Sequence, residues 1–165
     1  MRAIDVIVIG AGQAGLSASY YLKQEGVDHV VLDDRDRIGD QWRARWESLR
    51  LFTPSRYNDL PGMDFPGDPW SLAKKDIVAD FLEQYVSTYD LPVRLRHQVK
   101  RLAPEDGFVI ETNRDDWQAD SVIVATGAFQ TPSIPSCHAN LDPGIKQWHS
   151  SDYNEPDEVP EGRVL

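Results

Sequence analysis

A glycine-rich turn close to the N-terminus constrains the fold of this chain more than any other feature. Residues 4–9 are β-branched and apolar apart from one aspartate, which predicts a strand buried on both faces. Residues 13–25 carry small and apolar side chains at helical spacing, and residues 27–32 form a second apolar strand. Strand, tight turn, helix and strand within about 30 residues make a βαβ unit, which predicts a parallel sheet with a right-handed crossover. The turn itself consists of Gly10, Ala11, Gly12, Gln13, Ala14 and Gly15.

The three glycines of this turn have the spacing of a dinucleotide-binding fingerprint. We expect Gly10 to make the tight turn, Gly12 to let the backbone approach a pyrophosphate, and Gly15 to let the helix pack on the strand. The free amides and the dipole at the start of the helix would stabilise the anion. The glycine spacing alone is a weak signal, and its position between a strand and a helix makes it specific.

Two adjacent carboxylates follow the second predicted strand. Asp33 lies 18 residues after Gly15, where a carboxylate accepts hydrogen bonds from the hydroxyls of a ribose. Asp34 beside it adds a second negative charge, and the pair would repel a 2′-phosphate. We therefore expect the AMP half of FAD, or NAD, in preference to NADP. The motif does not distinguish FAD from NAD.

The middle of the chain combines an irregular aromatic segment with one helix. Residues 35–70 show no clean period and hold three tryptophans and four prolines, which indicates an ordered excursion over the surface. Apolar residues then recur at helical spacing, which predicts an amphipathic helix near 74–90.

A run of short strands is predicted after this helix. Residues 99–102 and 108–112 flank an Asp-Gly pair, which is a hairpin signal. Residues 117–119 add a third antiparallel strand, and residues 121–125 form a separate buried strand. Residues 131–165 are rich in proline and aspartate, and we expect 163–165 to open a further strand.

The overall charge excludes several function classes. The 165 residues include 27 acidic and 17 basic side chains, for a formal net charge of -10. This balance argues against binding nucleic acid or an anionic membrane surface. The single cysteine, Cys137, fits a cytoplasmic protein, and the four histidines lack metal-ligand spacing, so we expect no metal site. We expect a small-molecule substrate; a homo-oligomer is left open.

The order of these features resembles flavoproteins with two dinucleotide-binding domains. In them an N-terminal glycine turn binds FAD, a β-meander follows, and an Ala-Thr-Gly turn returns to the flavin. Within this group the chain resembles the flavin-containing monooxygenase family, especially its bacterial and YUCCA-like branch. The resemblance covers essentially the whole chain and is carried by residues 38–43, 49–54, 60–66 and 147–153.

The resemblance implies an α/β fold: a Rossmann-like, three-layer FAD-binding domain whose parallel sheet has an antiparallel β-meander insert. Residues 1–165 would form one domain, with a helical and aromatic excursion at about 40–97, ending before an NADPH-binding domain. FAD and NADPH would be the cofactors of a monooxygenase, while the catalytic residues stay unknown. Beyond the glycine turn and the two aspartates, the resemblance implies cofactor contacts from Gln41, Trp42, Thr53, Val99, Ala125, Thr126 and Gly127.

Two alternatives remain open on the sequence. One is a flavin-dependent reductase resembling thioredoxin reductase, and the other is a non-catalytic FAD-binding fragment. The aromatic residues at 42–70 and the His-Ser pair at 149–150 favour the monooxygenase over the reductase. The lack of a second glycine fingerprint favours the fragment for the chain as given.

Overall fold

The computed structural model, which describes residues 2–163, has one six-stranded mixed sheet. The strand order is β3-β2-β1-β6-β5-β4. The β3-β2-β1-β6 half is parallel, and β5 and β4 extend it in antiparallel fashion. The predicted α/β class and the parallel sheet with an antiparallel meander are confirmed. The strands are β1 (Arg2–Ile9), β2 (His29–Leu32), β3 (Val93–Arg94), β4 (Val99–Pro104), β5 (Phe108–Thr112) and β6 (Trp117–Val124).

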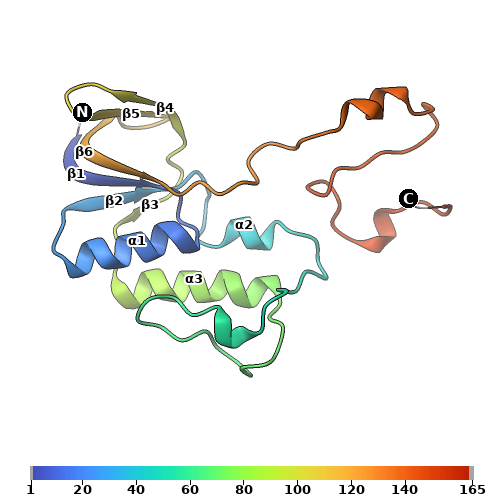
Figure 1. Ribbon diagram of the computed structural model, residues 1–165, viewed down its shortest axis with the longest axis horizontal. Helices are drawn as coiled ribbons and strands as arrows, with labels where there is room; N and C mark the ends of the chain where they lie inside the picture. The colour runs from blue at the N-terminus through green and yellow to red at the C-terminus, as the bar shows by residue number, and fades with distance from the viewer. Residues whose placement is uncertain (1, 164–165) are drawn as a thin grey trace.

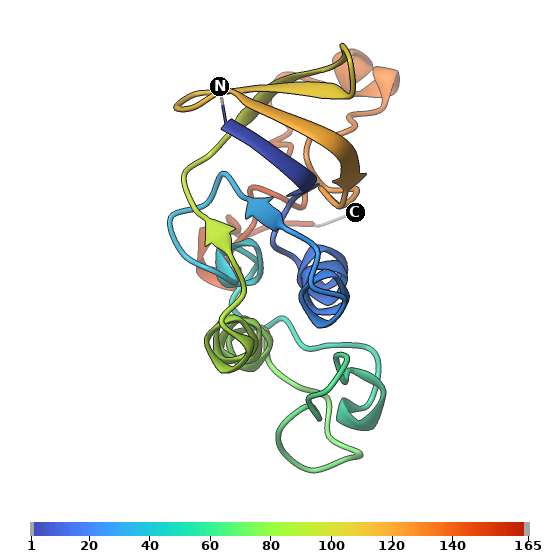
Figure 2. The ribbon, with the colours of Figure 1, turned by 90° about the vertical axis from the view of Figure 1, so that its left-hand side faces the viewer.

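The two long helices lie on the same side of the sheet (Figures 1 and 2). They are α1 (Gln13–Gln24) and α3 (Lys75–Tyr89), close to the ranges predicted from periodicity. A four-residue helix, α2 (Asp40–Arg43), interrupts the irregular excursion beside the N-terminal half of α3 (Figure 1). The remaining helical turns are the short 3-10 segments η1 (Ser55–Tyr57), η2 (Ser136–Asn140) and η3 (Pro156–Glu158).

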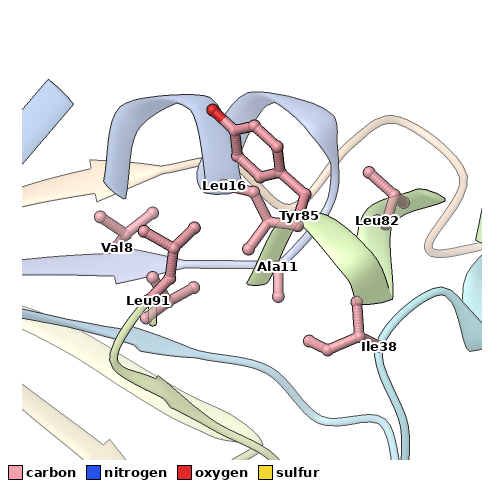
Figure 3. Close-up of a cluster of buried hydrophobic side chains, with 8 residues drawn as sticks. Val8, Ala11, Leu16, Ile38, Leu82, Tyr85 and Leu91 are labelled. Atoms are coloured by element: carbon pink, nitrogen blue, oxygen red, sulfur yellow. The ribbon is translucent and has the colours of Figure 1, made fainter. Parts of the chain in front are cut away.

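Alternation along β1 divides the core into two clusters on opposite faces of the sheet. Val8 lies in the cluster shared with α1 and α3, shown in Figure 3 with its neighbours Ala11, Leu16 and Tyr85. Ile7 and Ile9 lie in the second cluster, which includes side chains of the meander. Every second residue of the central strand faces each side of the sheet. The helices therefore pack on one face of the parallel strands and side chains of the meander pack on the other, which gives three layers. The second cluster consists of Ile7, Ile9, Val30, Leu32, Ile110, Trp117 and Ala119.

The predicted break between residues 117–119 and 121–125 is wrong. Both segments belong to the single strand β6, which pairs with β1 along most of its length. Its first residues also pair antiparallel with β5, from Trp117 to Ala119. Asp120 does not interrupt the strand because it is exposed, and the register with β1 continues from Ala119 to Ser121. One strand therefore serves both the meander and the parallel sheet.

The segment after residue 127 runs away from the sheet (Figure 1). Its side chains are mostly exposed, and its contacts with the excursion include a hydrogen bond from the Glu47 amide to the Asn154 carbonyl at 2.8 Å. The strand predicted at 163–165 falls largely on Val164 and Leu165, which lie outside the described residues. Within residues 2–163, no helix is long and apolar enough to cross a membrane, and no cluster of ligand side chains could hold a metal ion.

A buried tyrosine fastens the excursion to α3 and offers a test of the helical layer. Tyr85 is fully buried and its hydroxyl donates to the Pro61 carbonyl at 2.7 Å. Tyr85→Phe removes this donor from the carbonyl and is expected to lower the free energy of unfolding by about 1–2 kcal/mol. Urea unfolding measures the loss. Tyr21→Phe is the matched control, because Tyr21 is 58% exposed; an equal loss in both variants would contradict this interpretation.

The same tyrosine predicts a pH dependence. Burial raises the pKa of Tyr85 above its ordinary value. Because the folded-state pKa lies above the unfolded value of about 10, stability is retained below that pH and falls as the pH rises above it. The Tyr85→Phe variant should lose less stability over that alkaline range.

Candidate dinucleotide-binding site

The glycine turn is held at the carboxyl end of β1 by contacts that admit no side chain. The Gly10 amide donates to the Leu32 carbonyl at 2.7 Å, and Gly10 has a φ of +105°. A Cβ on Gly10 would lie 2.5 Å from the Ala125 carbonyl oxygen. A Cβ on Gly15 would lie 1.8 Å from the Gly10 carbonyl oxygen. These two glycines therefore set the close packing of α1 and the end of β6 around the turn.

Gly12 has a different environment from the other two glycines. It caps the N-terminus of α1 with a φ of −84°, which other residues also adopt, and no side chain caps the helix there. A Cβ on Gly12 would have no heavy atom within 4 Å among its described neighbours. Gly12, Gln13 and Ala14 are exposed. The start of α1 thus presents backbone N–H groups to open space, which is the arrangement that binds a phosphate.

Asp33 ties the end of β2 to the glycine turn. One carboxylate oxygen accepts from the Ala11 amide at 2.7 Å, and the other accepts from the Arg35 amide at 2.9 Å. An ionised carboxylate has about four acceptor positions, so two remain for further donors such as ribose hydroxyls. Asp34 is exposed, and its carboxylate lies 3.4 Å from Nε of Arg35.

The predicted Ala-Thr-Gly turn directly follows β6 and meets the glycine turn. The Ala125 amide donates to the Ile9 carbonyl at 2.8 Å, and the Ala125 carbonyl faces Gly10. Thr126 is exposed, and its carbonyl accepts a hydrogen bond from the Gln130 side chain. Gly127 has a φ of +72°, which favours glycine at the turn. Segments more than 100 residues apart are therefore adjacent at the carboxyl edge of the parallel strands.

Gln41 and Trp42 reach this edge from α2. The Gln41 Oε1 accepts from Nη2 of Arg35 at 2.8 Å, which connects α2 to the segment following Asp33. Trp42 is half-buried and packs against the cluster that contains Ala11. Trp42 also packs against a second cluster, which includes Val78 and Phe81 of α3. The cofactor contacts of Gln41 and Trp42 stay predictions.

Two other predicted residues make their contacts elsewhere. Thr53 is exposed in the excursion, and its hydroxyl donates to Oδ1 of Asn58 at 2.8 Å. Val99 packs against the cluster on the meander face of the sheet. Their roles toward a cofactor stay predictions.

An ion-pair cluster that no sequence pattern predicted joins α2 to α3. The Arg43 guanidinium bonds to the carboxylates of Asp40, Asp80 and Glu83. Arg37 donates two hydrogen bonds to Glu83, at 2.5 and 2.6 Å, and these lower the pKa of the Glu83 carboxyl. The only signal in the sequence is a set of acidic residues on the polar face of the predicted helix, and it does not reveal their partners.

Residues 7–165 match the model of a family described as pyridine nucleotide-disulphide oxidoreductase. The chain belongs to this family. It is 45% identical, over 98% of its length, to an uncharacterized CzcO-like oxidoreductase from Geobacillus kaustophilus, and covers 47% of that protein. It is 30% identical, over 96% of its length, to a probable indole-3-pyruvate monooxygenase, YUCCA1, from Arabidopsis thaliana, and covers 40% of it. The chain thus spans about half the length of the curated relatives it matches.

A solved structure confirms the likeness in three dimensions. A double mutant of a flavin monooxygenase from Stenotrophomonas maltophilia superposes with a TM-score of 0.87 and 32% identity. The match covers 96% of this chain and 48% of that one. The predicted resemblance to flavin-containing monooxygenases is therefore confirmed, and the matched region is the N-terminal half of the relatives.

Proposed function

We propose that this chain is the FAD-binding part of an NADPH-dependent flavin monooxygenase. The uncapped, exposed start of α1 beside Asp33 carries the proposal. Its open space at Gly12 suits a pyrophosphate, and the free acceptor positions of Asp33 suit the ribose of the AMP half.

The remaining residues of this edge fit the flavin half of FAD. Trp42 on α2 packs against the cluster that contains Ala11, and the Ala125 carbonyl of the turn of Ala125, Thr126 and Gly127 faces Gly10. We propose that Trp42 and this turn line the space for the flavin ring. Gln41, the neighbour of Trp42, is held by its hydrogen bond from Arg35. Bound FAD supplies the redox chemistry, while these residues bind and orient it and keep water from the ring.

NADPH and a small-molecule substrate complete the proposed reaction. Residues 128–165 contain only Gly144 and Gly162, so they hold no second glycine fingerprint. We therefore propose that NADPH is bound by a region that this chain does not include. The roughly twofold greater length of the relatives supports this proposal.

A visible absorbance spectrum of the purified chain, with and without added FAD, tests the cofactor assignment. We expect flavin bands that persist through desalting, with about one FAD bound per chain, as one fingerprint predicts. The α1 site implies that ADP competes with FAD, since both present a pyrophosphate. A chain that stays colourless after incubation with FAD would contradict the proposal.

A further inference from the structure

The helix α2 is too short to fix its own orientation. It has four residues, and a single turn of helix is unstable without tertiary contacts. Gly39 precedes it with a φ of +83° and lies so close to α3 that a Cβ there would be 2.7 Å from the Ala79 backbone. The position of α2 therefore depends on how it is attached to α3 (Figure 1).

Two basic side chains make this attachment, one from each helix. Arg43, whose side chain is 20% exposed, donates to the Ile38 carbonyl at 2.6 Å on its own segment. Its Nη2 lies 2.9 Å from Asp80 and 3.2 Å from Glu83 on α3. In return, Nζ of Lys75 at the start of α3 donates to the Arg43 and Arg45 carbonyls at 2.5 and 2.9 Å. These bonds hold both ends of α2, and we call Arg43, Lys75, Asp80 and Glu83 the α2 clamp.

The clamp adjoins the two α2 residues to which the resemblance assigns flavin contacts. Trp42 precedes Arg43 and packs between the cluster containing Ala11 and the cluster containing Val78 and Phe81, while the Arg43 guanidinium bonds to Glu83 on α3. Gln41 is bonded to Arg35, which follows the ribose-binding position. A change in the angle of α2 would therefore move Gln41 and Trp42, but it would leave Gly12 and Asp33 in place.

We infer that Arg43 and Glu83 are positioning residues for the flavin end of FAD, acting through the orientation of α2. They contact neither the glycine turn nor Asp33. The inference rests on the proposed function. It divides the site into an ADP half held by Gly12 and Asp33 and a flavin half that depends on the clamp.

Titrations of the chain with FAD and with ADP test this division. Arg43→Met and Glu83→Gln are expected to weaken FAD binding about tenfold, a change of about 1.4 kcal/mol. ADP affinity should change by no more than about twofold, since ADP lacks the flavin. The visible circular dichroism of bound flavin should also change, because the ring surroundings change. A merely structural effect would weaken both ligands equally and leave that spectrum unaltered.

Matched controls come from an ion pair on the meander. Nη1 of Arg101 on β4 and Oε1 of Glu111 on β5 lie 2.7 Å apart, and the meander lies on the opposite side of the parallel strands from α2 (Figure 1). Arg101→Met and Glu111→Gln should leave FAD affinity unchanged. If Arg43→Met does not fold, Asp80→Asn replaces it, because Asp80 is 65% exposed and supplies one clamp bond.

The outcomes separate the two proposals. If the unaltered chain binds no FAD, the proposed function fails. If the unaltered chain binds FAD and the clamp variants bind it equally well, or lose FAD and ADP affinity in parallel, the positioning role alone is overturned.

Discussion

Gly15→Ala is expected to prevent stable folding, whereas Gly12→Ala is expected to keep the fold and lose FAD. The new Cβ at Gly15 would lie 1.8 Å from the Gly10 carbonyl oxygen, which is backbone and cannot rotate away. Relief requires α1 to move off β1. Overpacking typically costs about 1–3 kcal/mol, and a clash with rigid backbone lies at or above the top of that range. That is a large part of the about 5–15 kcal/mol that stabilises a domain.

Gly12→Ala separates binding from folding at the same turn. The new methyl group meets no protein atom within 4 Å and the backbone angle is ordinary, so stability should fall by less than about 1 kcal/mol. The methyl group would occupy the space proposed for the pyrophosphate, and FAD affinity should fall at least about a hundredfold, since the backbone must approach the phosphates.

Thermal unfolding and an FAD titration of both variants measure the two effects. Unfolding followed by circular dichroism should show a cooperative transition for Gly12→Ala and none for Gly15→Ala. Tight FAD binding by Gly12→Ala would place the pyrophosphate elsewhere. A Gly15→Ala variant as stable as the unaltered chain would contradict the close packing of α1 on β1.

The parts of the fold predicted from sequence are those encoded locally. The strand, glycine turn and helix at residues 4–25 are marked by their own periodicity and by the glycines between them. The observed β1 and α1 lie close to the predicted ranges. The hairpin of β4 and β5 likewise depends on two neighbouring strands and the Asp-Gly turn between them. Each of these elements has its determinants within about 15 residues, where periodicity is informative.

The parts that were missed depend on partners distant in sequence. The sequence predicted two strands in place of β6 because Asp120 breaks the apolar pattern. Pairing with β1 on both sides of Asp120 keeps β6 continuous. The helix α2 has too few residues to show a period, and its bonds join Arg43 to residues 37 and 40 positions later in the chain. No local pattern in one sequence identifies such pairs, so the flavin half was predicted by resemblance and the ADP half by chemistry.

Asp33→Asn is expected to weaken FAD and ADP in parallel, by about a hundredfold, because the ribose contact belongs to both ligands. The carboxylate already accepts from the Ala11 and Arg35 amides, one on each oxygen. An asparagine can satisfy only one of these donors, since its NH₂ group would face the other. The variant should therefore lose about 1–2 kcal/mol of stability, as well as the charge-assisted bonds that we propose to the ribose.

Asp36→Asn is the matched control, because it removes the same charge three residues away at a position with no predicted cofactor contact. Asp36 is exposed, and its carboxylate pairs with Arg96, an ion pair that contributes less than about 1 kcal/mol at such a surface. Its FAD affinity should stay within about threefold of the unaltered chain. Equal losses in the two variants, measured by the same titrations, would show that net charge at this edge binds the cofactor. A loss confined to Asp33→Asn, parallel for FAD and ADP, would instead assign the ribose to that carboxylate, and it would differ from the FAD-only loss expected of the α2 clamp.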